Sequence, residues 1–556
     1  MQAAPEGAPV RGPQHVVRVA ARWLEDHRAI LALVAAGFVA RWFLAPWNSY
    51  WLDELDSVTL FGIWQDSIRD VARALRDTSI HPPLYQSVLW AWMQVFGDSE
   101  LATRSLSNLY VALATLFVHL TVCTGWGERT ALMTAFLFTF AGMPVRYALE
   151  TRSYAQTLFL VALSTYALLV ALRPHREAGL PSTSITALLP VIIVAGANTA
   201  LLLTHYYNLF WFVVQGLVAV ALLTLARGTP LRRRAGALVT MYVLPVVLFA
   251  LVWGRILIGQ VQSRAEAFAL EDDRPSRGLI DLARVMFDEN LASPVGMWRT
   301  LLVLVVLVGG TSILLDRLSG TARIPGQQAV TWLVSLTLFV GPLVATNLGF
   351  LLVGAERYSP RYFIFVTPSL IVLLSTSVHL MAGTIASRLH RGLDRAVADL
   401  VIAALILSSA LPAGLNAATH RKDDWRGIIA SAVTHIERDP ERIVVLDTSF
   451  RATPVSTYYF ARYSDDIRPV AVQRRRNEDR NSRREVDARI FPAIDALQDL
   501  EHDAVLVLFT HHRTRNFPIA LEELRGRYTA EEQRLSPDGR GYIIFRGPVP
   551  RTETAG

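Results

Sequence analysis

Residues 29–57 read AILALVAAGFVARWFLAPWNSYWLDELDS, a strongly apolar segment followed closely by three carboxylates, Asp53, Glu54 and Asp56. A helix of roughly 20 apolar residues crosses the hydrocarbon core of a bilayer, which is about 30 Å thick. Carboxylates this close together repel one another and lose hydration near lipid. The stretch therefore predicts a spanning helix with an acidic cluster at its mouth, and this cluster is the first candidate for chemistry.

Apolar blocks of similar length recur along the 556 residues, of which 52 % are hydrophobic. Long blocks, rather than short alternations, exclude a single soluble domain and predict a polytopic α-helical membrane protein. Eleven transmembrane helices are expected, at residues 29–47, 105–125, 131–147, 154–172, 185–203, 208–226, 235–258, 298–315, 329–353, 362–385 and 396–415.

A further apolar segment, residues 84–96, is shorter and follows two prolines, so we expect a re-entrant or interfacial helix. Arginines of short loops stay in the cytoplasm. If the N-terminus is inside and this segment does not cross, the arginine-rich loops all fall on the cytoplasmic side. They lie around residues 129, 173–176, 227–234, 317–323 and 388–395.

This topology gives three regions: a cytoplasmic tail (1–28), a transmembrane domain (29–415) whose first outer loop is 48–104, and an extracytoplasmic domain (416–556). In the last region, strand-like runs alternate with helical stretches, which is typical of a small α/β domain. The strands are expected at 442–447, 503–509 and 542–545, and the helices at 425–437 and 519–527. The polar run 473–489 predicts a solvated loop, or alternatively a contact with an anionic headgroup or substrate.

The single cysteine, Cys123, excludes an intramolecular disulfide framework and any cysteine-based metal site. We expect a buried thiol in a helix. The net charge of +7 supports no inference about nucleic acid. The chain also has no phosphate-cradling glycine loop, zinc-protease helix motif or nucleophile elbow.

Arginines should be rare in short outer loops, yet two of these loops carry a pair each. The pairs are Arg146 with Arg152 and Arg357 with Arg361. The planar guanidinium group binds phosphate oxygens in bidentate fashion, so these arginines suit a lipid phosphate or pyrophosphate. They can equally snorkel to headgroups or pair with Glu150 and Glu356.

A helix through the acidic cluster would place Asp53 and Asp56 on one side and turn Glu54 by about 100° from Asp53. One carboxylate could then act as a general base while its neighbour orients the substrate or holds a metal ion. The alternative is a helix cap, in which Asp53 accepts from free amide groups at the helix start.

Two histidines are expected near the same membrane face. His81 precedes two prolines and could bind metal or share a proton with the carboxylates, or it could be an ordinary interfacial histidine. His205 precedes Tyr206 and Tyr207 at a helix end, where an aromatic belt explains the tyrosines as well as sugar stacking would.

Taken in order, these segments resemble the dolichyl-phosphate-mannose protein mannosyltransferases, glycosyltransferase family 39, and their bacterial relatives that glycosylate lipid A, lipopolysaccharide core or proteins. The resemblance covers most of the chain. It rests on Trp51-Leu52-Asp53-Glu54, His81-Pro82-Pro83-Leu84-Tyr85, Phe96-Gly97-Asp98-Ser99-Glu100 with Arg104, residues 144–154, Thr204-His205-Tyr206-Tyr207, Ser359-Pro360-Arg361-Tyr362 and Asp423-Asp424-Trp425-Arg426.

The resemblance implies a GT-C fold in the bacterial cytoplasmic membrane, with the active site on the outer face. It implies a polyprenyl-phosphate sugar donor and a hydroxyl acceptor on a glycan, lipid or protein. The family's acidic pair corresponds to Asp53 and Glu54, with Asp53 as the base and inversion at the sugar. Arg104 corresponds to a structural or site-supporting arginine. The family varies in metal use, and Glu150 occupies one variable acidic position here, so a divalent metal ion is possible but not assigned.

Two other classes of function stay open. A transporter or flippase of lipid-linked sugars would favour paired repeats and charges near mid-membrane, whereas the ionisable residues here lie at span ends. A ligase or polymerase of lipid-linked glycans, or a non-catalytic membrane subunit, is the third class.

Overall fold

The computed structural model has two compact units, residues 1–45 with 71–420 and residues 46–70 with 421–556, and each is described by itself. The structure describes residues 24–79, 81–172, 185–225, 231–260, 279–291, 297–320, 324–353, 359–389, 393–420, 424–436, 443–447, 453–463, 468–471, 505–510, 521–522, 524–525, 528–535 and 541–548.

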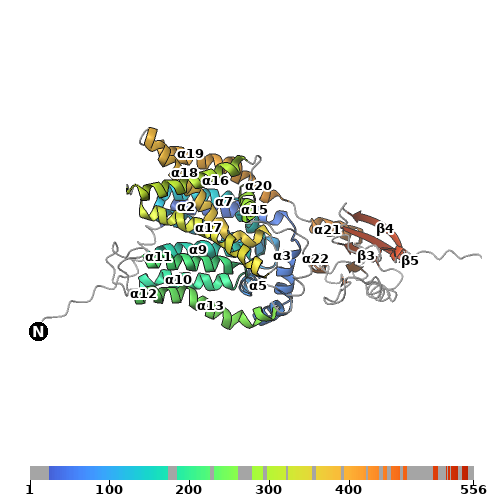
Figure 1. Cartoon of the computed structure of the whole chain (residues 1–556). Coiled ribbons are helices and arrows are strands. Elements are labelled where there is room, and N and C mark those ends of the chain that lie inside the picture. The colour runs from blue at the N-terminus through green and yellow to red at the C-terminus, as the bar shows by residue number, and fades with distance from the viewer. Residues whose placement is uncertain are drawn as a thin grey trace, which may run out of the picture. The chain divides into compact units, whose positions relative to one another are not determined.

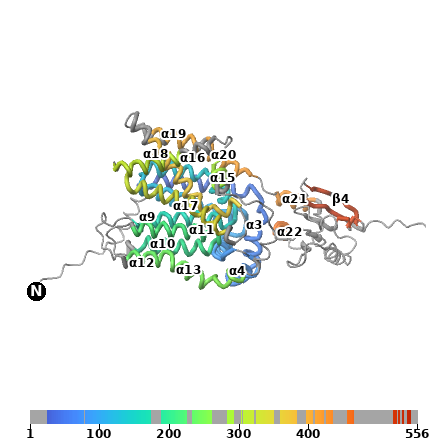
Figure 2. Tube along the Cα trace, in the orientation of Figure 1, coloured from blue at the N-terminus to red at the C-terminus, as the bar shows by residue number. Residues whose placement is uncertain are grey.

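The first unit is a bundle of apolar helices (Figures 1 and 2). Its elements are α2 (Arg28–Leu44), α4 (Ile68–Thr78, which begins in the second unit), α5 (Leu84–Phe96), α6 (Glu100–Trp126), α7 (Glu128–Phe140), α8 (Gly142–Ala148), α9 (Tyr154–Ala171), α10 (Ile185–Leu202), α11 (Asn208–Leu225), α12 (Leu231–Leu238), η4 (Val239–Val243), α13 (Leu244–Phe249), η5 (Ala250–Gly254), α15 (Leu279–Asn290), α16 (Met297–Leu318), α17 (Gly326–Val353), η6 (Pro360–Val366), α18 (Thr367–Leu389), α19 (Leu393–Leu405), η7 (Ile406–Ala410) and α20 (Leu411–Thr419).

Helices occupy every one of the expected spans, so the polytopic fold class is confirmed. In the described part of the chain, seven helices are long and apolar enough to cross a membrane. The number rises to eight if α7 and α8, bent by 58° at their junction, form one span. Two more apolar helices at expected spans, over Leu188–Leu202 and Asn208–Thr224, are shorter than this criterion requires.

Burial separates the helices into central and peripheral ones. The span Pro360–Ala382, which contains η6 and most of α18, is almost entirely covered by its neighbours. The span Arg233–Gln260 is mostly uncovered, with Leu251 and Val252 fully turned outward. Large apolar side chains left outside a packed bundle are what a lipid-facing surface requires. η6 therefore belongs to a span at the centre of the bundle, because neighbouring helices cover almost all of it.

The helix α5 has 13 residues and a length of about 20 Å, too short to cross the hydrocarbon core. Its first residue, Leu84, donates its amide hydrogen to the Leu203 carbonyl (2.9 Å), which ties its start to the end of α10. The helix stops at Gly97, whose φ of +80° suits a residue without a side chain.

Four helices share a buried polar network in the middle of the bundle. The Asn198 amide donates to Gln215 (3.2 Å) and to the Met241 carbonyl (3.1 Å), and its oxygen accepts from Ser164 (2.9 Å). The Tyr242 hydroxyl also donates to Gln215 (3.1 Å). The π-helical turn η4 contributes Met241 and Tyr242, and such turns loosen the carbonyl ladder. The network joins α9, α10 and α11 to η4 through satisfied hydrogen bonds.

The second unit contains a five-stranded sheet of order β2-β1-β3-β5-β4, in which β1 is parallel to β2 and β3, and β5 is antiparallel to β3 and β4. This confirms the expected α/β domain. The elements are α3 (Leu52–Leu55), η2 (Asp56–Ile63), α21 (Trp425–Ile436), β1 (Ile443–Asp447), α22 (Thr453–Phe460), β2 (Arg468–Ala471), β3 (Val505–Thr510), β4 (Tyr528–Leu535) and β5 (Gly541–Pro548). The polar run 473–489 lies outside the described residues.

The acidic segment folds with the C-terminal domain. Tyr50 donates its amide hydrogen to the Tyr459 hydroxyl (2.7 Å) on α22. Arg426, at the start of α21, donates to the Pro46 carbonyl (2.6 Å) and, through its amide, to Ser49 (3.1 Å). Residues 46–70 thus form one compact unit with residues more than 350 positions away, as these hydrogen bonds show.

Replacing Asn198 with Leu should lower the free energy of unfolding by about 1–3 kcal/mol, because the Met241 carbonyl and Ser164 hydroxyl lose a buried partner. Thermal unfolding in detergent measures the loss. Thr337→Val is the matched control, since exposed Thr337 bonds only to its own helix at Leu333. Equal stability of the two variants would contradict a stabilising network.

Candidate functional site

His205 lies at the centre of a ring cluster at one end of the first unit. It occupies the turn between α10 and α11 and is almost fully buried. Its ring centroid is 5.1 Å from that of His81, 5.6 Å from Tyr207, 5.8 Å from Tyr362 and 5.9 Å from Tyr154. Tyr154 opens α9, and Tyr362 lies in η6, so several helix ends meet here. We call these five residues the His205 cluster.

Two arginines border the His205 cluster. One Nη of Arg152 lies 3.5 Å from Nε2 of His81, and its guanidinium carbon lies 5.9 Å from the centre of the Tyr154 ring. The guanidinium carbon of Arg361 lies 5.5 Å from the centre of the Tyr362 ring. Both arginines were predicted from their violation of the charge rule. Two positive charges next to a buried, ring-lined turn form a site suited to an anion.

Burial, followed by the charges of Arg152 and Arg361, lowers the pKa of His205 to about 3. The ring is therefore neutral at pH 7. Its Nδ1 accepts from the Tyr207 amide (3.3 Å), so the hydrogen of the neutral ring resides on Nε2. Within the described part of the chain, that buried Nε2 makes no hydrogen bond. A buried N–H without an acceptor is costly, and a ligand oxygen would satisfy it.

A small cavity of about 10 Å³, enough for one water molecule, adjoins the cluster. Its lining residues are His81, Pro82, Tyr85, Gln86, Arg152, Ser153 and Thr204. The pocket lies where the start of α5, the turn before α9 and the end of α10 meet. It offers hydrogen-bond donors and an imidazole next to a guanidinium group.

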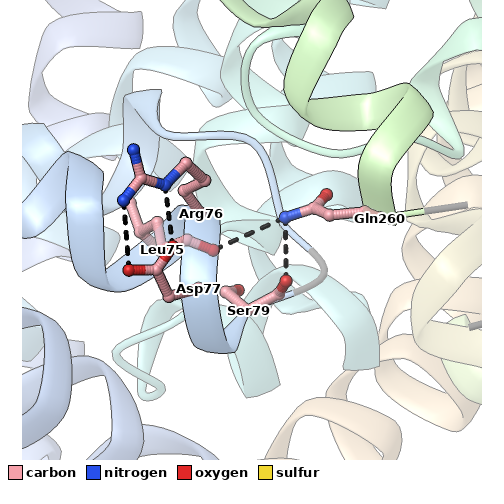
Figure 3. Close-up of polar contacts among 5 residues, drawn as sticks. All are labelled: Leu75, Arg76, Asp77, Ser79 and Gln260. Atoms are coloured by element: carbon pink, nitrogen blue, oxygen red, sulfur yellow. Dashed lines mark hydrogen bonds and ion pairs between the residues drawn. The ribbon is translucent and has the colours of Figure 1, made fainter. Parts of the chain in front are cut away.

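A relay of hydrogen bonds holds the turn that carries His81. Gln260 donates to the carbonyl of Ser79 (2.9 Å), beyond the end of α4, and Figure 3 shows its amide directed at this helix end. Its oxygen accepts from the Tyr206 hydroxyl (2.6 Å), which in turn accepts from Trp253 (2.8 Å). The Ser79 hydroxyl accepts from the His81 amide (3.0 Å). Tyr206, a candidate for sugar contact, thus uses its hydroxyl to position this turn.

Other predicted residues have structural partners. Arg146 forms an ion pair with Glu289 of α15 (2.7 Å), and Glu150 is buried. Arg104 is fully buried and donates to the Ala45 carbonyl (2.6 Å), which fits the expected structural role. Arg357 lies outside the described residues.

The carboxylates of the second unit differ in environment. Glu54 is fully buried, and its Oε2 accepts from the amide of Trp51 (3.3 Å), so it caps the start of α3. The sequence had indicated Asp53, and not Glu54, as the residue that could cap the helix. Asp53 and Asp56 are partly exposed and lie three residues apart, on one side of the helical segment.

One set of three His, Cys, Asp or Glu side chains converges closely enough to hold a metal ion among the described residues. It is His119, Cys123 and Glu128, and it does not belong to the His205 cluster.

Sequence reasoning did not single out Tyr154, Tyr362 or Gln260 as functional. Tyr154 and Tyr362 lay within the motifs that carry the family resemblance, so their neighbourhood was marked without a role. Gln260 carried no signal, because its partner at residue 79 is 181 positions away.

No protein-family profile and no curated protein sequence matches the chain. Solved structures do match. The crystal structure of ArnT from Cupriavidus metallidurans bound to undecaprenyl phosphate has 14 % identity and a TM-score of 0.51, over 93 % of this chain and 99 % of that one. Its apo state gives the same identity and TM-score over 96 % and 100 %. The oligosaccharyltransferase AglB from Archaeoglobus fulgidus, in complex with an inhibitory peptide and a dolichol-phosphate, gives 14 % and 0.44 over 95 % and 76 %. At this identity, the likeness to ArnT establishes the fold.

The depressed pKa of His205 predicts acid sensitivity. Below the ordinary pKa of 6.5, the unfolded chain binds a proton that the folded chain does not. Stability is therefore complete above pH 6.5 and falls by about 1.4 kcal/mol per pH unit below it, or about 2 kcal/mol at pH 5. Thermal unfolding at pH 7.5 and pH 5 should show that His205→Asn loses less stability on acidification than the wild type. His420→Gln, at an exposed histidine, should behave like the wild type; an unchanged pH dependence in His205→Asn would contradict the prediction.

Proposed function

We propose that this chain, which has the GT-C glycosyltransferase fold, transfers a sugar from a polyprenyl-phosphate donor to a hydroxyl group. The acceptor would be a glycan, a lipid or a protein at the outer face of a bacterial cytoplasmic membrane. The observation that carries the proposal is the convergence of Arg152, Arg361 and the buried Nε2–H of His205 at one end of a membrane bundle.

A lipid phosphate suits these three donors. Its charged oxygens can accept bidentate hydrogen bonds from guanidinium groups, and an additional one from the neutral imidazole. Its polyprenyl tail can remain in the bilayer along the exposed apolar helix faces. The ArnT structure was solved with undecaprenyl phosphate, a molecule of this kind. Of the four arginines predicted for this role, we retain Arg152 and Arg361, because these two border the His205 cluster. Arg146 pairs with Glu289, and Arg357 lies outside the described residues.

Asp53 is proposed as the general base. It would remove the proton of the acceptor hydroxyl as that oxygen forms a bond to the anomeric carbon of the sugar. The bond between this carbon and the phosphate oxygen breaks on the opposite face, so the configuration inverts and the electron pair leaves with the lipid phosphate. The negative charge on that phosphate grows in the transition state, and fixed positive groups stabilise it there.

Glu54 has a supporting role in this proposal. Its carboxylate is buried and bonded to the Trp51 amide, whereas Asp53 and Asp56 are partly exposed. Of these two, Asp53 belongs to the acidic pair on which the family resemblance rests. A divalent metal ion near Asp53 or His81 remains a sequence-based expectation, and the proposed reaction does not require one.

Asp53→Asn should lower the rate of sugar transfer about 10²- to 10⁴-fold, the contribution of a general base. Binding of undecaprenyl phosphate should be unchanged. Transfer is measured with purified protein, a radiolabelled polyprenyl-phosphate sugar and envelope extract as acceptor. Asp66→Asn, an exposed carboxylate of the same unit, is the matched control. Full transfer by Asp53→Asn would refute the base assignment, and lipid translocation without transfer by the wild type would favour a flippase.

Arg361→Gln and Arg152→Gln should each weaken the binding of undecaprenyl phosphate about 10- to 100-fold, because a hydrogen bond to a charged group contributes about 1.5–3 kcal/mol. Fluorescence or calorimetric titration in detergent measures the dissociation constant. Arg76→Gln is the control, since this exposed arginine pairs with Asp77 on α4 (Figure 3). Unaltered binding by both variants would show that the phosphate does not bind at the His205 cluster.

A further inference from the structure

The far end of α6 carries three converging ligand groups. His119 and Cys123 lie four residues apart, on one face of the helix. Gly127, with φ of +82°, turns the chain, and Glu128 opens α7. One ligand atom from each of the three side chains lies within 4.8 Å of the other two. We call this set the α6–α7 corner.

The distances within the α6–α7 corner match those around a tetrahedral zinc ion. His119 Nε2 lies 3.2 Å from Glu128 Oε2, and Cys123 Sγ lies 3.5 Å from the same oxygen. Zinc binds nitrogen and oxygen at about 2.0–2.1 Å and sulfur at about 2.3 Å. A tetrahedron with these bond lengths has a nitrogen–oxygen edge of about 3.3 Å and a sulfur–oxygen edge of about 3.5 Å. Two of the three ligand–ligand distances therefore agree with those that a shared ion would impose, and the third is below 4.8 Å.

Burial points to the same conclusion. The His119 side chain is fully buried, and its Nε2 faces the carboxylate of Glu128. The Glu128 side chain is 42 % exposed and Cys123 is partly exposed, so an ion has a path of entry.

We propose that His119, Cys123 and Glu128 bind a divalent transition-metal ion, zinc by its donor set, with water in the fourth position. One nitrogen, one thiolate and one carboxylate suit zinc, whereas magnesium and calcium prefer oxygen ligands alone. Binding displaces the thiol proton into solvent, so the thiolate carries the bond to the metal. Cys123 is partly exposed and not the buried thiol that was expected, and the proposal departs from the expectation that excluded a cysteine-based metal site.

The proposed metal site is separate from the His205 cluster. Thr103, near the start of α6, shares a hydrogen bond with Thr151 (2.8 Å), the neighbour of Arg152. Cys123 lies 20 residues further along the same helix, a rise of about 30 Å. The ion would fasten α6 to α7 at the opposite end of the bundle, and the inference stands independently of the proposed transferase activity.

The test uses the full chain, purified in detergent and freed of metal with a chelator. Titration with Co²⁺ should saturate at one equivalent. It should give the visible bands of four-coordinate cobalt and a near-ultraviolet thiolate-to-cobalt band, and both should disappear when Zn²⁺ is added. Cys123→Ser should abolish the thiolate band, and His119→Gln and Glu128→Gln should each weaken Co²⁺ binding at least 10-fold. His379→Gln is the control, since this histidine packs on Trp126 nearby but lies outside the set.

Absence of a thiolate band in the wild type, or full Co²⁺ affinity in both His119→Gln and Glu128→Gln, would overturn the proposal. Size-exclusion profiles show whether each variant is folded. If a variant is unfolded, alkylation of wild-type Cys123 provides the test, because this residue is the single cysteine of the chain. Zn²⁺ should slow its alkylation by a maleimide at least 10-fold, and an unchanged rate would rule out the site.

Discussion

The candidate site depends on keeping one imidazole neutral beside two guanidinium groups. His205 can be neutral because four rings exclude water from it and because the charges of Arg152 and Arg361 oppose its protonation. A protonated ring there would repel the arginines and separate the helix ends that carry them. A neutral ring that accepts at Nδ1 instead keeps a donor at Nε2. Burial thus costs stability in acid, and at neutral pH it leaves the ring uncharged beside the two arginines that we propose hold an anion.

This arrangement requires that several helix ends lie close together. Hydrogen bonds outside the His205 cluster hold these ends in place. The network around Asn198 fixes α9, α10 and α11 against one another within the bundle. Gln260 then secures the end of α4, and through Ser79 it secures the turn bearing His81. None of these side chains belongs to the His205 cluster. Their hydrogen bonds are made inside an apolar unit, where leaving any of them unsatisfied is expensive.

The sequence predicted the fold well because the bilayer imposes a simple rule, about 20 apolar residues per crossing, and the blocks obey it. The rule that arginine is rare in short outer loops also pointed to Arg152 and Arg361 as candidates, because an arginine in such a loop is costly unless it has a function. What local patterns could not provide was pairing across the chain. Arg146 looked identical to Arg152 in sequence, but Glu289, 143 residues away, pairs with it. Cys123 looked inert because the carboxylate beside it, Glu128, lies beyond a turn that periodicity does not describe.

The same limit applies to the acidic segment and gives the C-terminal domain a role. From the sequence, residues 46–70 are expected at the end of the first span and in the first outer loop, 48–104, without any link to the C-terminal domain. In the structure, Tyr459 and Arg426 hold the backbone at Tyr50, Ser49 and Pro46, immediately before Asp53. Glu54 then caps α3 from within. The orientation of Asp53 is therefore set by contacts with the C-terminal domain, and this domain acts as the scaffold of the acidic cluster rather than as an independent appendage.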